Sequence, residues 1–126
     1  MIRRFIPSTD KKKGLPGANE MEGWARSNRY GAGAKRKAWK KHVVYSLGKM
    51  PKFKRIWLEI TYYEPNKKRD PDNIAAFKKI LIDALVESGA IENDGWKQVA
   101  GWKELFRIDK ENPGIEISIW DGRGEL

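Results

Sequence analysis

The most restrictive feature of the sequence is a change of hydrophobic period between residues 56 and 85. From Ile56 to Tyr62 every second residue is apolar, which is the pattern of a strand with one buried face. From Ile74 to Leu85 the apolar residues recur every three or four positions, as in a helix with one buried stripe. A central strand followed by an amphipathic helix predicts a domain in which helices cover a sheet.

Weaker signals divide the rest of the chain into further elements. A short apolar stretch ended by Pro7 predicts an edge strand, and residues 7–19, rich in Lys, Gly and Pro, predict a basic loop. Gly31 and Gly33 are expected to interrupt a basic helix that Gly48 ends. We therefore predict one α+β domain over residues 1–126, with the order β, broken α, β, α, β, β and helices packed on a small mixed sheet. The expected strands are residues 2–6, 53–63, 96–108 and 115–120, and the expected helices are residues 20–29, 34–47 and 71–88.

The residue types that the chain lacks exclude several kinds of site. It has no Cys and one His, His42, which excludes disulfides, Cys-based zinc sites and thiol nucleophiles, and disfavours a Ser/His/Asp triad. Any metal ion must therefore be held by oxygen atoms. No apolar run is long enough to span a membrane, and no phosphate-binding loop is complete. We expect a cytoplasmic protein with no membrane partner and no small-molecule cofactor.

Positive charge is concentrated in the first half of the chain. Residues 1–55 contain 16 Lys or Arg and three acidic residues, whereas residues 56–126 contain 10 Lys or Arg and 14 acidic residues. A basic half interleaved with aromatic residues is typical of nucleic-acid binding, although basic helices can also be simple solvated faces. The predicted nucleic-acid-binding residues are Arg26, Arg29, Lys35, Arg36, Lys37 and Lys40, together with Lys67, Lys68 and Arg69 before the main helix.

Two carboxylates and an amide lie at the predicted start of the main helix, where residues 70–73 read Asp-Pro-Asp-Asn. Helix capping is one interpretation, because Asp is a preferred N-cap residue and Pro suits the first helical position. Capping does not explain why Asp72, Lys79 and Asp83 fall on one stripe of the helix. Lys79 and Asp83 would also suit an ordinary i,i+4 ion pair. The spacing therefore leaves both a helix cap and a divalent-cation site open.

The same segment resembles the RusA-type Holliday-junction resolvases of bacteria and their prophages. The resemblance implies that Asp70, Asp72 and Asp94 bind Mg²⁺, with Mn²⁺ as a substitute, and that these residues and Lys79 are catalytic. Three extra residues precede Lys79 in this chain, so Lys78 is the alternative basic residue. Asn73 and Asp83 are expected to support the site. The motif consists of residues 70–73, Lys79, Asp83-Ala84-Leu85, Gly89 and Asn93-Asp94, and residues 28–35 are similar to a basic element of some phage members.

The resemblance implies a function as well as a site. It implies a Mg²⁺-dependent, structure-selective endodeoxyribonuclease that resolves Holliday junctions by paired nicks in DNA recombination and repair. Its partners would be four-way-junction DNA and a second copy of the chain, because paired nicks need two active sites. Two other classes stay open. One is a non-catalytic DNA-binding protein of prophage origin, and the other is an RNA-binding module that stacks bases on Trp24, Tyr30 and Trp39.

The position of Asp94 bears on how such a site would be assembled. If residues 71–88 form one unbroken helix, its ends lie about 26 Å apart. Residues 89–93 can span at most roughly 18 Å. Asp94 would then not reach Asp70 and Asp72 of the same chain. We therefore predict a composite site, with Asp70 and Asp72 from one subunit and Asp94 from its partner.

Overall fold

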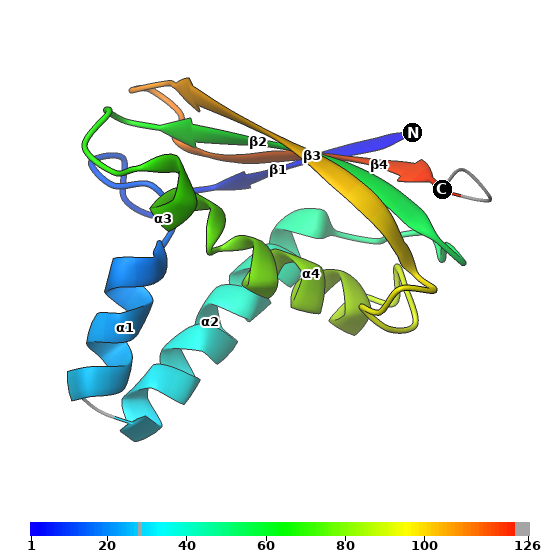
Figure 1. Cartoon of the computed structure of the whole chain (residues 1–126), viewed down its shortest axis with the longest axis horizontal. Coiled ribbons are helices and arrows are strands. Elements are labelled where there is room, and N and C mark those ends of the chain that lie inside the picture. Colours follow the sequence, from blue (N-terminus) through cyan, green and yellow to red (C-terminus); the bar gives the residue numbers. More distant parts are fainter. Residues whose placement is uncertain (28, 123–126) are drawn as a thin grey trace.

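The computed structural model describes residues 1–27 and 29–122, and the side chain of Arg29 is not among the described parts. Helices and strands follow one another along the chain as Figure 1 shows. The elements are β1 (Ile2–Pro7), α1 (Ala18–Ser27), α2 (Arg29–Leu47), β2 (Ile56–Glu64), α3 (Pro71–Ala75), α4 (Lys78–Glu87), β3 (Val99–Ile108) and β4 (Gly114–Asp121).

The strands form one four-stranded mixed sheet with the order β1-β4-β2-β3. β2 is parallel to β3 and antiparallel to β4, which also pairs antiparallel with β1. The prediction of a single α+β domain with a small mixed sheet is confirmed, as are an edge position for residues 2–6 and a central position for β2. Although β3 and β4 follow one another in sequence, β2 lies between them.

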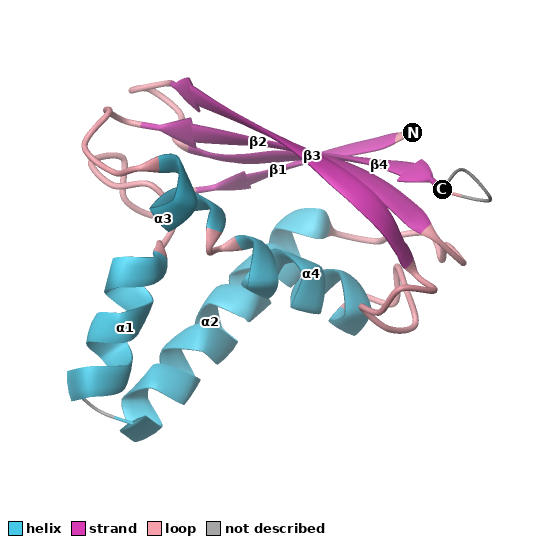
Figure 2. Cartoon of the chain, viewed as in Figure 1, coloured by secondary structure: helices cyan, strands magenta, loops and turns pink. Residues whose placement is uncertain are grey.

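The helices lie on one face of the sheet (Figures 1 and 2). The inward side chains of β2, from Ile56 to Tyr62, are buried on this face, as the alternating pattern predicts. Phe77, Leu81 and Leu85 are fully buried against the same core. Among the described helices, none is long and apolar enough to cross a membrane.

The division of the basic helix differs from the prediction. α1 ends at Ser27 and α2 begins at Arg29, so Gly31 and Gly33 lie inside α2 instead of interrupting it. A glycine inside a helix costs only about 1 kcal/mol, and α2 packs against both α4 and β1. The predicted end of the helix at Gly48 is confirmed, because Gly48 has a φ of 65°.

The main helix is also interrupted, so the expectation of one unbroken helix over residues 71–88 is wrong. The composite site therefore loses its support from helix length and stays a prediction. Between α3 and α4, the N–H groups of Ala76 and Phe77 donate to the carbonyl groups of Asn73 and Ile74, at 3.4 and 3.3 Å. These bonds span three residues, as in a 3₁₀ turn, instead of the four of an α-helix. α4 then ends at Glu87, and Gly89 follows two residues later with a φ of 82°, which is the glycine end that the sequence predicts.

Candidate active site

Asp70 and Asp72 lie at the start of α3, and both are exposed. Asp70 occupies the N-cap position with an extended backbone, at φ −75° and ψ 152°, but its side chain makes no capping hydrogen bond. The carboxylate of Asp72 accepts a hydrogen bond from the N–H of Asn73 at 2.9 Å. Helix capping therefore accounts for the backbone of Asp70 and leaves its carboxylate available for another purpose.

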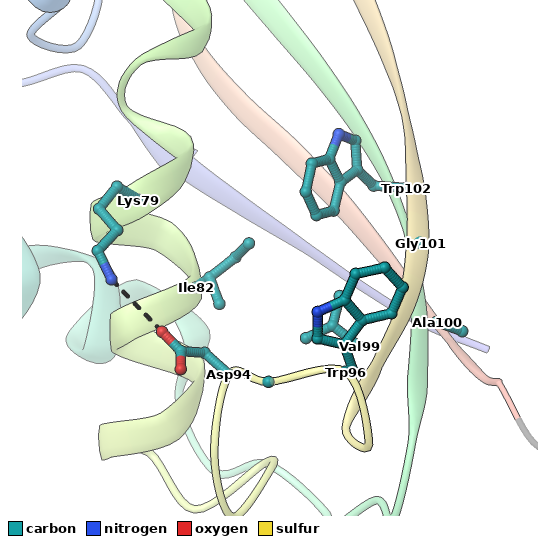
Figure 3. A pocket seen from close by; sticks show the side chains of 9 residues that line it. Lys79, Ile82, Asp94, Trp96, Val99, Ala100, Gly101 and Trp102 are labelled. Atoms are coloured by element: carbon teal, nitrogen blue, oxygen red, sulfur yellow. Dashed lines mark hydrogen bonds and ion pairs between the residues drawn. The ribbon is translucent and has the colours of Figure 1, made fainter.

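Lys79 and two carboxylates form a second charged cluster on α4 and the turn after it. Figure 3 shows Lys79 and one of these carboxylates, that of Asp94. The Lys79 ammonium lies 3.1 Å from Asp83 Oδ1 and 3.4 Å from Asp94 Oδ2. The hydrogen bond and the negative charge of Asp83, followed by those of Asp94, raise the pKa of Lys79. Two residues of the predicted site that are 15 positions apart, Lys79 and Asp94, are thus in contact. We call Lys79, Asp83 and Asp94 the α4 cluster.

Lys78 has a different set of partners, all on the sheet side of α4. Its ammonium lies 2.8 Å from Glu104 Oε1 and 4.5 Å from the centre of the Trp102 ring. Glu104 also accepts a hydrogen bond from the hydroxyl group of Tyr62, and burial together with this bond raises the pKa of Tyr62. Lys78 therefore fastens α4 to β3, and Lys79 is the basic residue beside Asp94.

The three predicted metal ligands are not gathered into one group within the described chain. No three His, Cys, Asp or Glu side chains of the described residues are arranged to hold a metal ion. Asp70 lines a cavity with the loop before α3 and the end of β3, whereas Asp94 lines a cavity between α4 and the start of β3. The structure brings Asp94 to Lys79 and leaves Asp70 and Asp72 at the start of α3.

The cavity beside Asp94 has a volume of about 440 Å³ and contains aromatic residues that the sequence analysis did not single out. Trp96 lies in the turn after Asp94 and is 94% exposed, and Trp102 of β3 lines the same side of the cavity, across from Lys79 (Figure 3). The signal in the sequence was a Trp two residues after a predicted ligand. Strand β3 was expected to begin at residue 96, but a turn over residues 95–98 keeps Trp96 out of the sheet.

The predicted basic residues of α2 lie next to the α4 cluster. Arg36, Lys37 and Lys40 line a cavity together with Asp83, and Lys40 is also 3.7 Å from Glu87. The other predicted nucleic-acid contacts are more scattered. Lys35 lies over the Trp24 ring, Arg26 pairs with Glu22, Lys67 and Lys68 are exposed in the loop before α3, and the Arg29 side chain lies outside the described residues.

Arg69, a predicted nucleic-acid contact, differs from the other predicted contacts in being largely buried. Its guanidinium group donates to Glu64, Glu20 and the carbonyl group of Leu15, and only 18% of its side chain is exposed. Burial lowers the pKa of Arg69, but hydrogen bonds and negative charge from Glu64 and Glu20 outweigh this effect and raise the pKa. Four of its five N–H donors are used within the chain, so Arg69 has a structural role, and its contact with nucleic acid stays a prediction.

The aromatic residues of the RNA-binding alternative are unequal in exposure. Trp39 packs edge-on against Phe77 and His42 and is half-buried, and Trp24 is partly covered by Lys35. Tyr30 is 88% exposed. Only one of the three proposed stacking residues therefore presents a largely free ring.

A search of protein-family models and of curated proteins finds no match for this chain.

We predict that Asp83→Asn lowers the pKa of Lys79 more than Asp94→Asn does, because Asp83 makes the closer contact with the ammonium group. Each substitution removes a charge that stabilises protonated lysine, so both shifts are downward. NMR titration of the labelled Lys79 side chain would measure them. The control is Glu116→Gln, which removes a carboxylate paired with Arg3 on the sheet. An unchanged pKa in Asp83→Asn would contradict the ion pair.

Proposed function

We propose that the chain is a Mg²⁺-dependent, structure-selective endodeoxyribonuclease that acts as a homodimer and resolves four-way DNA junctions by paired nicks. The observation that carries the proposal is the contact between Lys79 and Asp94, at 3.4 Å across 15 residues. The resemblance to RusA-type resolvases implies that these two residues belong to one active site. The basic residues of α2 border the same cluster and would hold the DNA backbone beside it.

The donor set suits the proposed cation. Mg²⁺ prefers carboxylate oxygens, and Asp70, Asp72 and Asp94 offer exposed carboxylates. When bound, the cation would neutralise charge on the scissile phosphate and activate a water molecule. The ammonium group of Lys79, which the neighbouring carboxylates keep protonated, would stabilise charge that develops on the phosphate or on the leaving oxygen.

A homodimer would complete this set of ligands. Within the described chain no group of three carboxylates is placed to hold a metal ion, although the three predicted ligands are exposed on its surface. A two-fold axis could bring the start of α3 of one subunit to the turn after α4 of its partner. Each dimer would then carry two sites, as paired nicks across a junction require.

A non-catalytic DNA-binding protein is the second candidate. It is favoured by the hydrogen bond from the N–H of Asn73 to Asp72, which gives this carboxylate a structural use in α3. Replacing Asp72 separates the two candidates.

We predict that Asp72→Asn abolishes Mg²⁺-dependent nicking of a four-way junction and leaves junction binding unchanged or tighter. The substitution removes a metal ligand together with a charge that repels phosphate. The loss of unfolding free energy should be about 1 kcal/mol or less, because the charge near the helix start is exposed. Nicking assays, binding assays and urea unfolding would measure these effects. Glu111→Gln, in the exposed loop between β3 and β4, is the control. A folded, fully active Asp72→Asn variant would identify the cluster as structural.

We predict that mixing Asp72→Asn and Asp94→Asn chains restores nicking. In a composite arrangement, one site of each mixed dimer carries both substitutions and the other carries neither, so single nicks should return without paired resolution. The chains would be refolded together and assayed on a labelled junction, with each variant refolded alone as the control. Inactive mixtures, with subunit exchange shown by mass spectrometry, would place all ligands within one chain.

We predict that replacing Lys35, Arg36 and Lys37 with Ala makes the dependence of junction affinity on salt shallower. Each lost phosphate contact reduces the slope of log affinity against log salt by about 0.9. Fluorescence anisotropy at several salt concentrations would give the slope. A triple variant that neutralises Lys103, Arg107 and Lys110, which are exposed on and after β3, is the matched control and should keep the wild-type slope. A wild-type slope in the Lys35, Arg36 and Lys37 variant would move the DNA surface away from α2.

A further inference from the structure

One guanidinium group connects four separate segments of the chain. The Nε and Nη2 atoms of Arg69 each donate to the Glu64 carboxylate at 2.9 Å, which ties the loop before α3 to the end of β2. Nη1 donates to Glu20 of α1 at 2.6 Å, and Nη2 also donates to the carbonyl group of Leu15 at 2.8 Å. We call Arg69, Glu64, Glu20 and Leu15 the Arg69 cluster.

The chain packs so closely around this cluster that a Cβ atom at either of two glycines would meet neighbouring atoms. A Cβ atom on Gly14 would collide with the Glu64 carboxylate and with Arg69. A Cβ atom on Gly17 would lie 2.7 Å from both the carbonyl oxygen and Oδ1 of Asn73. The second half of the basic loop is therefore pressed against the segment that carries Asp70 and Asp72. Leu15 and Gly17 are buried accordingly.

A second hydrogen bond also attaches this segment to α1, on the C-terminal side of Asp70 and Asp72. Oδ1 of Asn73 accepts a hydrogen bond at 2.9 Å from the N–H of Asn19, in the first turn of α1. Asp70 directly follows Arg69, and Asp72 directly precedes Asn73. Both carboxylates are therefore bracketed by residues that are hydrogen-bonded to α1.

We propose that Arg69 is a positioning residue, which fixes Asp70 and Asp72 in the orientation that binds the divalent cation and fastens α1 to the same place. This inference rests on the proposed nuclease function. The bidentate contact with Glu64 fixes the position of Arg69, because a guanidinium group binds a carboxylate in one plane. It thereby fixes the backbone that enters α3 at Asp70. Glu64 is 5% exposed, so loss of Arg69 would leave its carboxylate largely shielded from water and without its main partner. Arg69 acts through the protein and makes no contact with DNA.

The test compares neighbouring cations. In Arg69→Gln, the Mg²⁺ concentration for half-maximal nicking should rise roughly 10- to 100-fold, as for other residues that orient metal ligands. The salt slope of junction binding should stay the same. Lys68→Gln removes the adjacent, exposed charge and is the matched control. It should make the slope shallower by about 0.9 and leave the Mg²⁺ requirement unchanged.

A second variant, and amide exchange as a measurement that does not depend on nicking, test the inference even if Arg69→Gln folds poorly. Glu20→Gln removes only the α1 partner, whose side chain is 41% exposed. In both variants, the amides of Asn19 and Met21, which are hydrogen-bonded to Asn73 and Gly17, should exchange with solvent faster than in the wild type.

Each result supports or overturns the inference. A shallower salt slope in Arg69→Gln with an unchanged Mg²⁺ requirement would make Arg69 a phosphate contact. Unchanged amide exchange in both variants would show that the cluster does not hold α1. A wild-type chain that does not nick any junction would overturn the proposed function and the positioning role with it, whereas faster exchange in the variants would still locate the attachment of α1 at Arg69.

Discussion

The parallel pairing of β2 with β3 is the constraint on which the rest of the structure depends. Parallel neighbours cannot be joined by a tight turn, so the chain must cross from the end of β2 to the start of β3 over the face of the sheet. α3 and α4 form this crossover, and the buried face of β2 provides the surface that they cover. Asp70, Asp72, Lys79 and Asp94 all lie within it. The connection that the sheet requires is thus also the segment that carries the candidate site.

The basic and acidic halves of the chain lie side by side in the fold. The basic first half contributes α2, and the more acidic second half contributes α4, and these helices pack against each other. Arg36, Lys37 and Lys40 consequently line one cavity with Asp83. A polyanion attracted to α2 would be brought to the α4 cluster. The carboxylates there would repel phosphate unless a cation lay between them, which is why the proposed nuclease depends on divalent metal.

Features that depend on neighbouring residues in sequence could be predicted, and those that depend on distant contacts could not. The period of β2, the amphipathic stripe from Ile74 to Leu85 and the glycine ends of α2 and α4 are local, and each agrees with the structure. The placement of β2 between β3 and β4 depends on which strands pair, which no local pattern states. Arg69 looked like its exposed neighbours Lys67 and Lys68, because only the fold brings Glu64, Glu20 and Leu15 around it. Of the candidate site, the contact of Lys79 with Asp83 follows from helical spacing, whereas its contact with Asp94 required the turn after α4.

Because the helix is broken at Ala76 and Phe77, the candidate site residues are supported in two places: α3 is attached to α1, and α4 is attached to the sheet. Positions 72 and 79 lie on the same face only in an unbroken helix. Because the helix is broken between them, Asp72 and Lys79 need not point in the same direction. α3 is held to α1 through Asn73, whereas α4 is held to the sheet by its buried face and by Lys78. A reaction that uses Asp72 and Lys79 together, whether in one chain or across a dimer, requires these two supports to be fixed relative to each other. Within each chain, the proposed positioning role of Arg69 would contribute to this, because its single side chain bonds both to α1 and, through Glu64, to the end of β2.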